Sequence, residues 1–394
     1  MNYKKSSILP EACAKKLEHD LNRLIIPADK GKNLVLGKPP SPGDVILQSN
    51  DYLNLGNHPS VIGAQISSLR SSKNNSFMSN VFLHNDALSR KTACEMSSFT
   101  EFDHCIIAPS GWIANTALMQ TICHSNSNVY IDFFTHMSLW EGARYAGANI
   151  FPFMHNNTRH LKRLIRRNGP GIVVVDAIYS TIGTIAPLSD IIAVAKDENC
   201  ATVVDESHSL GTHGPQGAGL LKHLNISADV DFMTASLAKT FAYRAGAIWC
   251  NNRFGESLPY TAYSSIFSSA MMESELERIR ATLSVIKTCD RERETLFENA
   301  NILIQGLKKI GFNIRSQSQI IAIETGDSTN TINVRNYLDK HGVLGSVFCP
   351  PATPNNKNII RLSIHSDITK DQIEHVLSIF RQAFNQPNLY FMQP

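Results

Sequence analysis

Short apolar runs alternate with longer helix-patterned segments from about Val45 onward, and this alternation constrains the fold more than any other feature. The runs lack the polar alternation of a half-exposed strand, which is typical of strands buried on both faces. The runs are Cys105–Pro109, Asn128–Asp132, Gly171–Asp176, Ala201–Glu206, Asp231–Ser236 and Ala245–Cys250. We therefore expect an α/β fold in three layers, with a mostly parallel sheet covered by helices on both faces.

The pattern changes after a long helical stretch over Met271–Ile310. Beyond it, the sequence predicts three strands and two helices. The strands are expected at Phe312–Arg315, Gln319–Gly326 and Asn358–Ile364, and the helices at Thr331–His341 and Lys370–Phe384. Residues 385–394 resemble a tail.

The chain has 394 residues, which exceeds the size at which a single core stops growing. We expect an N-terminal arm over residues 1–45, with a helix over 10–25 and a connector over 29–44. A large domain would then span residues 46–285, and a smaller α+β domain residues 286–394.

Charge and composition narrow the class of protein. The net charge is only +3, and the basic segment Arg159–Arg167 has the pattern of an amphipathic helix with a solvated face, so no nucleic-acid partner is expected. No apolar stretch approaches the ~18 residues of a membrane span. Eight cysteines lack any C-x-x-C spacing and are expected as buried, reduced thiols. These features predict a cytoplasmic protein without a membrane anchor.

Chemically useful side chains follow the expected strands. In an open α/β sheet, ligands bind beyond the carboxyl ends of the strands. The residues at these positions are Ser110, Gly111 and Trp112, then His136, then Tyr179 and Ser180, then Asp205, Glu206 and His208, and finally Lys239. Each residue alone has an ordinary explanation, such as a helix cap or a surface side chain. Together they place a phosphate-binding helix start, an imidazole, hydroxyls, a carboxylate and an amine on one rim.

Three other kinds of site are disfavoured. The segment from Asp205 to His213 has metal-ligand residue types without a metal-ligand spacing, so no metal is expected. The glycine-rich Gly211–Gly219 lacks the lysine of a P-loop, and we expect a flexible loop there. "PSGWIA" is not a G-x-S-x-G elbow, which argues against a hydrolase triad.

Two motifs resemble those of a known family. "DESHSLGTHGPQGAG" and "TASLAK" are similar to the signatures of the α-oxoamine synthases, which are fold-type I pyridoxal-phosphate enzymes. The resemblance extends from Leu47 to His365, nearly the whole chain. It implies the aspartate-aminotransferase-like fold and pyridoxal 5′-phosphate as cofactor.

The resemblance implies a role for each residue on the rim. Lys239 would bind the cofactor aldehyde and move the substrate Cα proton, because a desolvated amine with a lowered pKa is a good nucleophile. Asp205 would pair with the pyridine nitrogen, His136 would stack on the ring, and His208 would bind near the ring oxygen. The remaining cofactor contacts implied are Ser110, Gly111, Trp112, Ser180, Thr234 and Ser236, with Ser268 or Ser269 reaching the phosphate from a second subunit of a homodimer.

The family's substrates imply an acyltransferase. Arg361 would grip the amino-substrate carboxylate, with Asn50 and Tyr52 near it. The likeness to enzymes that make an α-aminoketone precursor of a quorum-sensing signal, an autoinducer, implies a medium-chain acyl-CoA and either S-adenosylmethionine or 2-aminobutyrate.

Departures from the family pattern at Ser207, Ala238 and Cys349 leave the cofactor assignment intact but the amino substrate open. The alternatives are a pyridoxal-phosphate aminotransferase or lyase, and a non-catalytic binding protein of the same fold.

Overall fold

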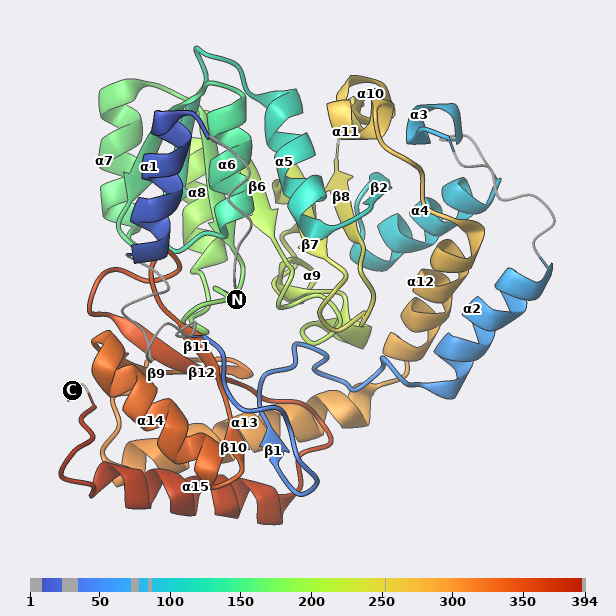
Figure 1. The fold of residues 1–394 in the computed structure, drawn as a ribbon. Coiled ribbons are helices and arrows are strands. Elements are labelled where there is room, and N and C mark those ends of the chain that lie inside the picture. Colours follow the sequence, from blue (N-terminus) through green and yellow to red (C-terminus); the bar gives the residue numbers. More distant parts are fainter. Residues whose placement is uncertain (1–8, 23–34, 72–77, 84–86, 252, 392–394) are drawn as a thin grey trace.

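The computed structural model describes residues 9–22, 35–71, 78–83, 87–251 and 253–391. Its centre is a seven-stranded sheet in the order β2-β8-β7-β6-β5-β3-β4 (Figure 1). The strands are β2 (His104–Ala108), β3 (Asn128–Asp132), β4 (Asn149–Phe153), β5 (Ile172–Asp176), β6 (Ala201–Asp205), β7 (Phe232–Ser236) and β8 (Gly246–Cys250). Only β8 runs antiparallel to its neighbours, β2 and β7. The mostly parallel sheet is therefore confirmed, and β4 is a strand that the sequence analysis did not predict.

Alternate residues of the strands enter two separate cores, so the sheet is buried on both faces. Tyr130 and Val173 pack in one core with α7 (Thr158–Asn168) and α8 (Leu188–Asp197). Val129 and Val174 pack in the other with α5 (Gly111–Ile122) and α6 (Met137–Tyr145). This is the expected three-layer arrangement. The basic segment forms α7, whose Leu161 and Ile165 are buried, as its amphipathic pattern predicts.

Helices at the edge of the large sheet come from distant parts of the chain. They are α2 (Pro59–Ser71), α3 (Asn80–Leu83), α4 (Ala87–Thr100), α10 (Phe254–Thr261), α11 (Tyr263–Ile266) and α12 (Glu273–Ile286). In Figure 1, α12 lies beside α2 and α4, and the contacts of these helices agree. Between β6 and β7 lies the short helix α9 (Leu220–His223).

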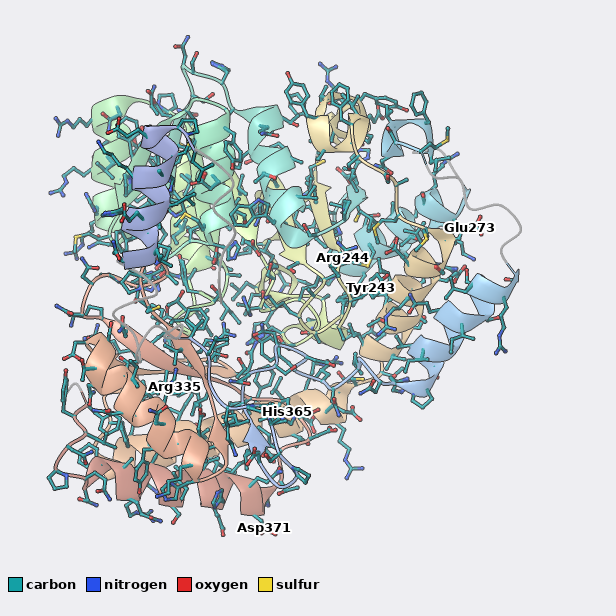
Figure 2. All side chains as sticks on the ribbon, in the orientation of Figure 1. Tyr243, Arg244, Glu273, Arg335, His365 and Asp371 are labelled. Carbon is teal, nitrogen blue, oxygen red and sulfur yellow. The ribbon has the colours of Figure 1, made fainter. Side chains whose placement is uncertain are left out.

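The C-terminal part has its own antiparallel sheet, in the order β11-β12-β9. Its strands are β9 (Ile320–Gly326), β11 (Ser346–Phe348) and β12 (Asn358–Ser363), and its helices are α13 (Asp290–Ile310), α14 (Ser328–Lys340) and α15 (Lys370–Phe384). A two-residue strand, β1 (Val45–Ile46), pairs in parallel with β10 (Val343–Leu344). The chain near the expected first domain boundary therefore pairs with the C-terminal part. Figure 2 shows Arg335, His365 and Asp371 in this part and Tyr243 and Arg244 on the side of the large sheet.

Four local expectations need correction or extension. Residues 312–315 form no strand, because Phe312 instead packs its ring against Phe384 and Phe391. The long helical stretch is broken between α12 and α13. Cys13 and Cys94 are exposed rather than buried, although all eight cysteines lie among the described residues and are free thiols. The tail is docked as far as Phe391, which is buried.

The N-terminal arm begins as the helix α1 (Glu11–Asp20), which has no buried residues. The end of the expected helix and the first part of the expected connector lie outside the described residues. Within the described part of the chain, no helix has the length and apolar character needed to cross a bilayer.

Candidate active site

A cavity of about 260 Å³ lies beyond the carboxyl ends of β5, β6 and β7. It collects side chains from both parts of the molecule. Its lining residues are Asn50, Gly111, Trp112, Asn115, His136, Asp176, Ser180, Asp205, Ser207, His208, Ser236, Lys239, Phe348 and Arg361. Ten of the fifteen residues that the sequence analysis assigned to cofactor or substrate therefore meet in one place, as parallel strands ending at the same edge require.

Asp205 ends β6 and is held by two neutral donors. Asn115 Nδ2 donates to Asp205 Oδ2 at 2.8 Å, and the backbone N–H of Ser207 donates to Oδ1 at 2.8 Å. The residue is 4% exposed. A carboxylate fixed in this way can pair with a cationic or N–H group of a ligand without first having to be ordered.

Lys239 lies in a tight loop between β7 and β8. The loop is closed by backbone hydrogen bonds from Leu237 to Ala245 and from Ala242 to Lys239. Burial lowers the pKa of the Lys239 amine, and the positive charge of Arg361 lowers it further, while Asp205 opposes both effects. A partly buried amine with a lowered pKa is uncharged, and therefore nucleophilic, for a larger fraction of the time.

His136 caps the N-terminus of α6 and faces the same cavity. Its backbone N–H lies 3.2 Å from each carboxylate oxygen of Asp176, and its ring makes an edge contact with Trp112 at 6.1 Å between centroids. Burial lowers the pKa of His136, and Asp205 partly offsets this effect. The imidazole is therefore disposed to be neutral.

His208 is fixed from behind by Tyr52. The Tyr52 hydroxyl lies 2.6 Å from His208 Nδ1. Burial, followed by the charges of Lys239 and Arg361, holds the pKa of His208 well below its usual range. Tyr52 is fully buried and does not line the cavity, so it supports His208 rather than facing a ligand.

The start of α5 approaches the end of β7 closely. A Cβ added to Gly111 would lie 2.5 Å from the Cβ of Ser236, so only glycine fits there. The Ser110 hydroxyl accepts from the N–H of Ile113 at 3.2 Å as an N-cap. A helix N-terminus with a glycine and the Ser236 hydroxyl beside it is suited to an anion such as phosphate.

Arg361 reaches the cavity from β12 of the C-terminal sheet. Its guanidinium donates to the Ser180 carbonyl at 2.7 Å and to Asn50 Oδ1 at 2.8 Å, and it lies over the Phe348 ring at 4.7 Å. Nε of Arg361 is buried without a hydrogen-bond partner among the described residues. A planar guanidinium that lines the cavity is suited to a carboxylate.

Several expected residues lie outside the cavity wall. Ser110 uses its hydroxyl as the cap of α5. Thr234 is fully buried, and its hydroxyl has no partner among the described residues. Ser268 donates to the Ser264 carbonyl, and Ser269 forms an isolated bridge with Ser79; both line a separate hollow of about 30 Å³.

The sequence analysis missed Asn115, Asp176 and Phe348, and noted Ser207 only as a departure from the family pattern. Asp176 is the last residue of β5, so the strand-end rule could have found it. Its pKa is raised well above the usual value because it is buried and lies near Asp205. Asn115 lies about one helical turn after Gly111, on the same face of α5. No motif marks Phe348.

The glycine-rich segment after Asp205 is a compact turn organised by Glu206. This carboxylate is fully buried and accepts from the backbone N–H groups of Leu220 and Leu221 at 2.9 and 2.6 Å. Gly211 and Gly219 close the turn with backbone hydrogen bonds to Gly217 and His213. The segment thus anchors the end of β6 rather than forming a loose loop.

Comparisons with known proteins agree with this geometry. The family model for aminotransferase class I and II matches residues 42–380. The chain is 49% identical over 387 residues to a CAI-1 autoinducer synthase of Vibrio campbellii, covering 98% of both chains. It is 29% identical over 367 residues to a serine palmitoyltransferase of Sphingomonas paucimobilis, covering 89% of this chain and 87% of the relative.

Among solved structures, a serine palmitoyltransferase with a pyridoxal-phosphate internal aldimine superimposes with a TM-score of 0.81 at 26% identity, covering 86% of this chain and 87% of that one. The expected fold is thereby confirmed. The chain belongs to the aminotransferase class I and II family and, within it, to the group of α-oxoamine synthases that includes the CAI-1 autoinducer synthase.

Proposed function

We propose that this protein is a pyridoxal-phosphate-dependent acyltransferase that joins an amino substrate to a medium-chain acyl-CoA. A bond forms between the amino-substrate Cα and the thioester carbonyl carbon. The C–S bond breaks, coenzyme A leaves as the thiol, and the substrate carboxyl leaves as CO₂, so the product is an α-aminoketone. S-adenosylmethionine and 2-aminobutyrate are the amino substrates proposed, and the product would be a precursor of an autoinducer.

The observation that carries this proposal is the single cavity that holds Lys239, Asp205, His136 and Arg361. The residues present fit pyridoxal phosphate. An amine with a lowered pKa suits an aldehyde, a fixed carboxylate suits a pyridine nitrogen, and the helix start at Gly111 suits a phosphate. When bound, this cofactor supplies a place for the electrons of a substrate carbanion.

Each side chain of the cavity would then have a separate role. Lys239 would hold the cofactor and carry the proton to and from the substrate Cα. Asp205 would keep the pyridine nitrogen protonated, His136 would cover one face of the ring, and His208 and Ser180 would donate near the ring oxygen. Arg361, which already bonds Asn50 and the Ser180 carbonyl, lines the cavity, and its guanidinium would orient the amino-substrate carboxylate.

A second hollow supports an acyl chain as the other substrate. An apolar groove of about 940 Å³ lies between α1 and the segment after β11. Its lining residues are Leu9, Ala14, Leu17, Glu18, Asp20, Leu21, Val35, Val347, Phe348, Cys349, Pro350, Pro351 and Ala352. Phe348 lines both this groove and the cofactor cavity. A chain lying in the groove would therefore end near the reacting carbonyl.

We further propose a homodimer in which Ser268 or Ser269 of one subunit reaches the phosphate of the other. Both serines lie outside the cavity of their own chain, shortly after Tyr263 and Phe267 in the sequence. Tyr263 and Phe267 are 68% and 79% exposed, which is unusual for large apolar side chains and favours a protein interface. The free thiols and the acyl-CoA substrate favour the cytoplasm as the site of action. We also propose that the chain divides into an N-terminal arm over residues 1–45, a large domain over 46–285 and a smaller domain over 286–394.

The decisive experiment compares the purified protein with Lys239→Ala after incubation with pyridoxal phosphate. We expect a visible absorption band in the wild type and in Lys196→Ala, a control that removes a surface lysine, but no such band in Lys239→Ala. Thiol release from acyl-CoAs of different lengths is then measured with each amino substrate, and the product is identified by mass.

Each alternative gives a different result in these assays. A band without thiol release would favour the aminotransferase or lyase. A colourless protein would favour the binding protein and would sink the proposal.

A further inference from the structure

A continuous run of buried hydrogen bonds connects His136 to Asp205. His136 Nδ1 lies 2.7 Å from Ser138 Oγ, and Asn115 Nδ2 lies 2.9 Å from the same oxygen. Asn115 Nδ2 also donates to Asp205 Oδ2 at 2.8 Å. Ser138, Asn115 and Asp205 are 0%, 3% and 4% exposed, so water does not replace these bonds. Neither Asn115 nor Ser138 carries a role in the proposed chemistry.

The direction of each hydrogen bond follows from the groups at the Asp205 end. An ionised carboxylate only accepts, so the Asn115 amide must turn its nitrogen toward Asp205, since its oxygen would meet a like charge there. The second N–H of the same nitrogen is then given to Ser138 Oγ. The opposite amide orientation would lose the bond to Asp205 and set the amide oxygen against the carboxylate.

Ser138 must therefore give its own proton to His136. Its oxygen already accepts from Asn115, and within the described part of the chain His136 Nδ1 is the remaining hydrogen-bond neighbour that can accept the hydroxyl proton. The backbone N–H of Ser138 also points at Nδ1, at 3.4 Å. A proton on Nδ1 would face both donors, so a neutral His136 carries its proton on Nε2.

We propose that Asn115 and Ser138 are positioning residues that hold His136 in its Nε2–H tautomer and fix the orientation of the Asp205 carboxylate. The inference rests on the proposed function for its meaning, because that function places His136 and Asp205 against the same cofactor ring. The Asn115 amide nitrogen thus influences both the tautomer of His136 and the orientation of the Asp205 carboxylate.

The arrangement has a chemical consequence for the ring site. A proton on Nδ1 would leave the Ser138 hydroxyl proton and the Ser138 backbone N–H without this acceptor, so the network disfavours the imidazolium form of His136, and burial acts in the same direction on its pKa. Among the described residues, the hydrogen bonds to Asp205 come from the neutral donors Asn115 and Ser207, so the carboxylate has no cationic hydrogen-bond partner there that would compete with a pyridine N–H. The network therefore supplies one uncharged ring and one charged carboxylate.

The tautomer can be measured in the cofactor-free protein by ¹⁵N NMR of labelled histidine, with His136→Gln to assign the signal. We expect a protonated Nε2 and an unprotonated Nδ1 near neutral pH. Ser138→Ala should raise the Nδ1–H fraction, whereas Ser138→Cys, which keeps a weak donor of similar size, should give an intermediate fraction. A wild-type signal with the proton on Nδ1, or a tautomer unchanged in Ser138→Ala, overturns the inference.

A second measurement tests the Asp205 end of the network. Loss of one hydrogen bond to a charged group should weaken pyridoxal-phosphate binding by about tenfold in Asn115→Ala. The control is Thr116→Val, which removes a neighbouring buried hydroxyl that bonds only within its own helix. Equal affinities for Asn115→Ala and Thr116→Val, with both variants folded by circular dichroism, contradict the proposed positioning of Asp205. Failure of the wild type to bind the cofactor would instead count against the proposed function and leave the tautomer result standing.

Discussion

The cofactor cavity and the apolar groove share Phe348, yet they are built from different kinds of contact. The cavity is lined by ionisable and polar side chains at strand ends, and most of them are held by hydrogen bonds at defined atoms. The groove is lined mainly by apolar side chains, which come from α1 and the residues flanking it and from β11 and the segment after it. α1 has no buried residue of its own, so one wall of the groove is a helix whose apolar side chains are exposed.

This difference separates two tasks. Charges and hydrogen bonds fix the position and protonation of reacting groups, and small displacements there cost much of the rate. An apolar wall recognises only shape and length, and its contribution grows gradually with the area it covers. We therefore expect changes in the cavity to alter the reaction itself, and changes in the groove to alter the choice of acyl chain.

The largest expected effect is that of Asp205→Asn. It removes the charge that faces the pyridine nitrogen while keeping the size of the side chain. We expect kcat to fall by about 10³-fold, because the Asp205 charge would stabilise the developing carbanion by way of the cofactor ring and asparagine lacks this charge. The acyl-length preference measured by thiol release should stay the same. A changed length preference would break the separation of the two regions.

Arg361→Lys should have a smaller effect on the amino substrate. A lysine keeps the charge but cannot reproduce the planar contacts with Asn50 and the Ser180 carbonyl. We expect KM for the amino substrate to rise by about 10- to 100-fold, with KM for acyl-CoA changed little. Steady-state kinetics with each substrate varied in turn checks this. An effect confined to acyl-CoA would assign Arg361 to the other region.

Leu17→Trp tests the groove directly. Leu17 is 57% exposed on α1, and the larger ring should shorten the space for an acyl chain. Each methylene excluded from an apolar wall costs about fourfold in kcat/KM, so longer acyl-CoAs should lose most. The matched control is Leu69→Trp on α2, where Leu69 is 54% exposed and does not line the groove. Equal length profiles for both variants would exclude the groove as the acyl site.

The smallest expected effect is a change in the stability of the protein with pH. His208 has a lowered pKa in the folded protein, so the unfolded chain binds more protons below about pH 6.5, and stability should fall as the pH falls. We expect the free energy of unfolding to lose up to about 1.4 kcal/mol per pH unit from this group between pH 6.5 and 5. Denaturant unfolding of His208→Asn, measured at several pH values, should give a free energy of unfolding that falls less steeply as the pH falls. An unchanged dependence on pH would mean that another group controls the loss of stability in acid.

The strand-end rule predicted most of the cofactor cavity because it uses only the order of apolar runs. Lys239, Asp205, His136 and Ser180 were found in this way, each beyond an expected strand. The rule could not find Asn115, which lies inside a helix, or Phe348, which comes from the small sheet. Both reach the cavity through packing between elements that are distant in the sequence.

The errors in the fold have similar causes. The short strand β4 was missed because it is an edge strand that contains Pro152, which weakens the strand pattern. Residues 312–315 have a strand-like pattern, but they join no sheet, and the Phe312 ring packs among other aromatic rings. The tail resembled a free end, and only the three-dimensional structure shows that Phe391 completes that aromatic cluster.

The sequence by itself determined the layered fold and the identity of the main chemical groups, because apolar periodicity and residue type are local properties of the chain. Only the tertiary structure decided that Arg361 meets Asn50 over Phe348, that Asn115 bonds Asp205, and that Ser138 lies against His136 Nδ1. These relations depend on distances of about 3 Å between elements that are far apart in the chain. A hydrogen bond forms or fails within a few tenths of an ångström, and no periodicity in a sequence records such a distance.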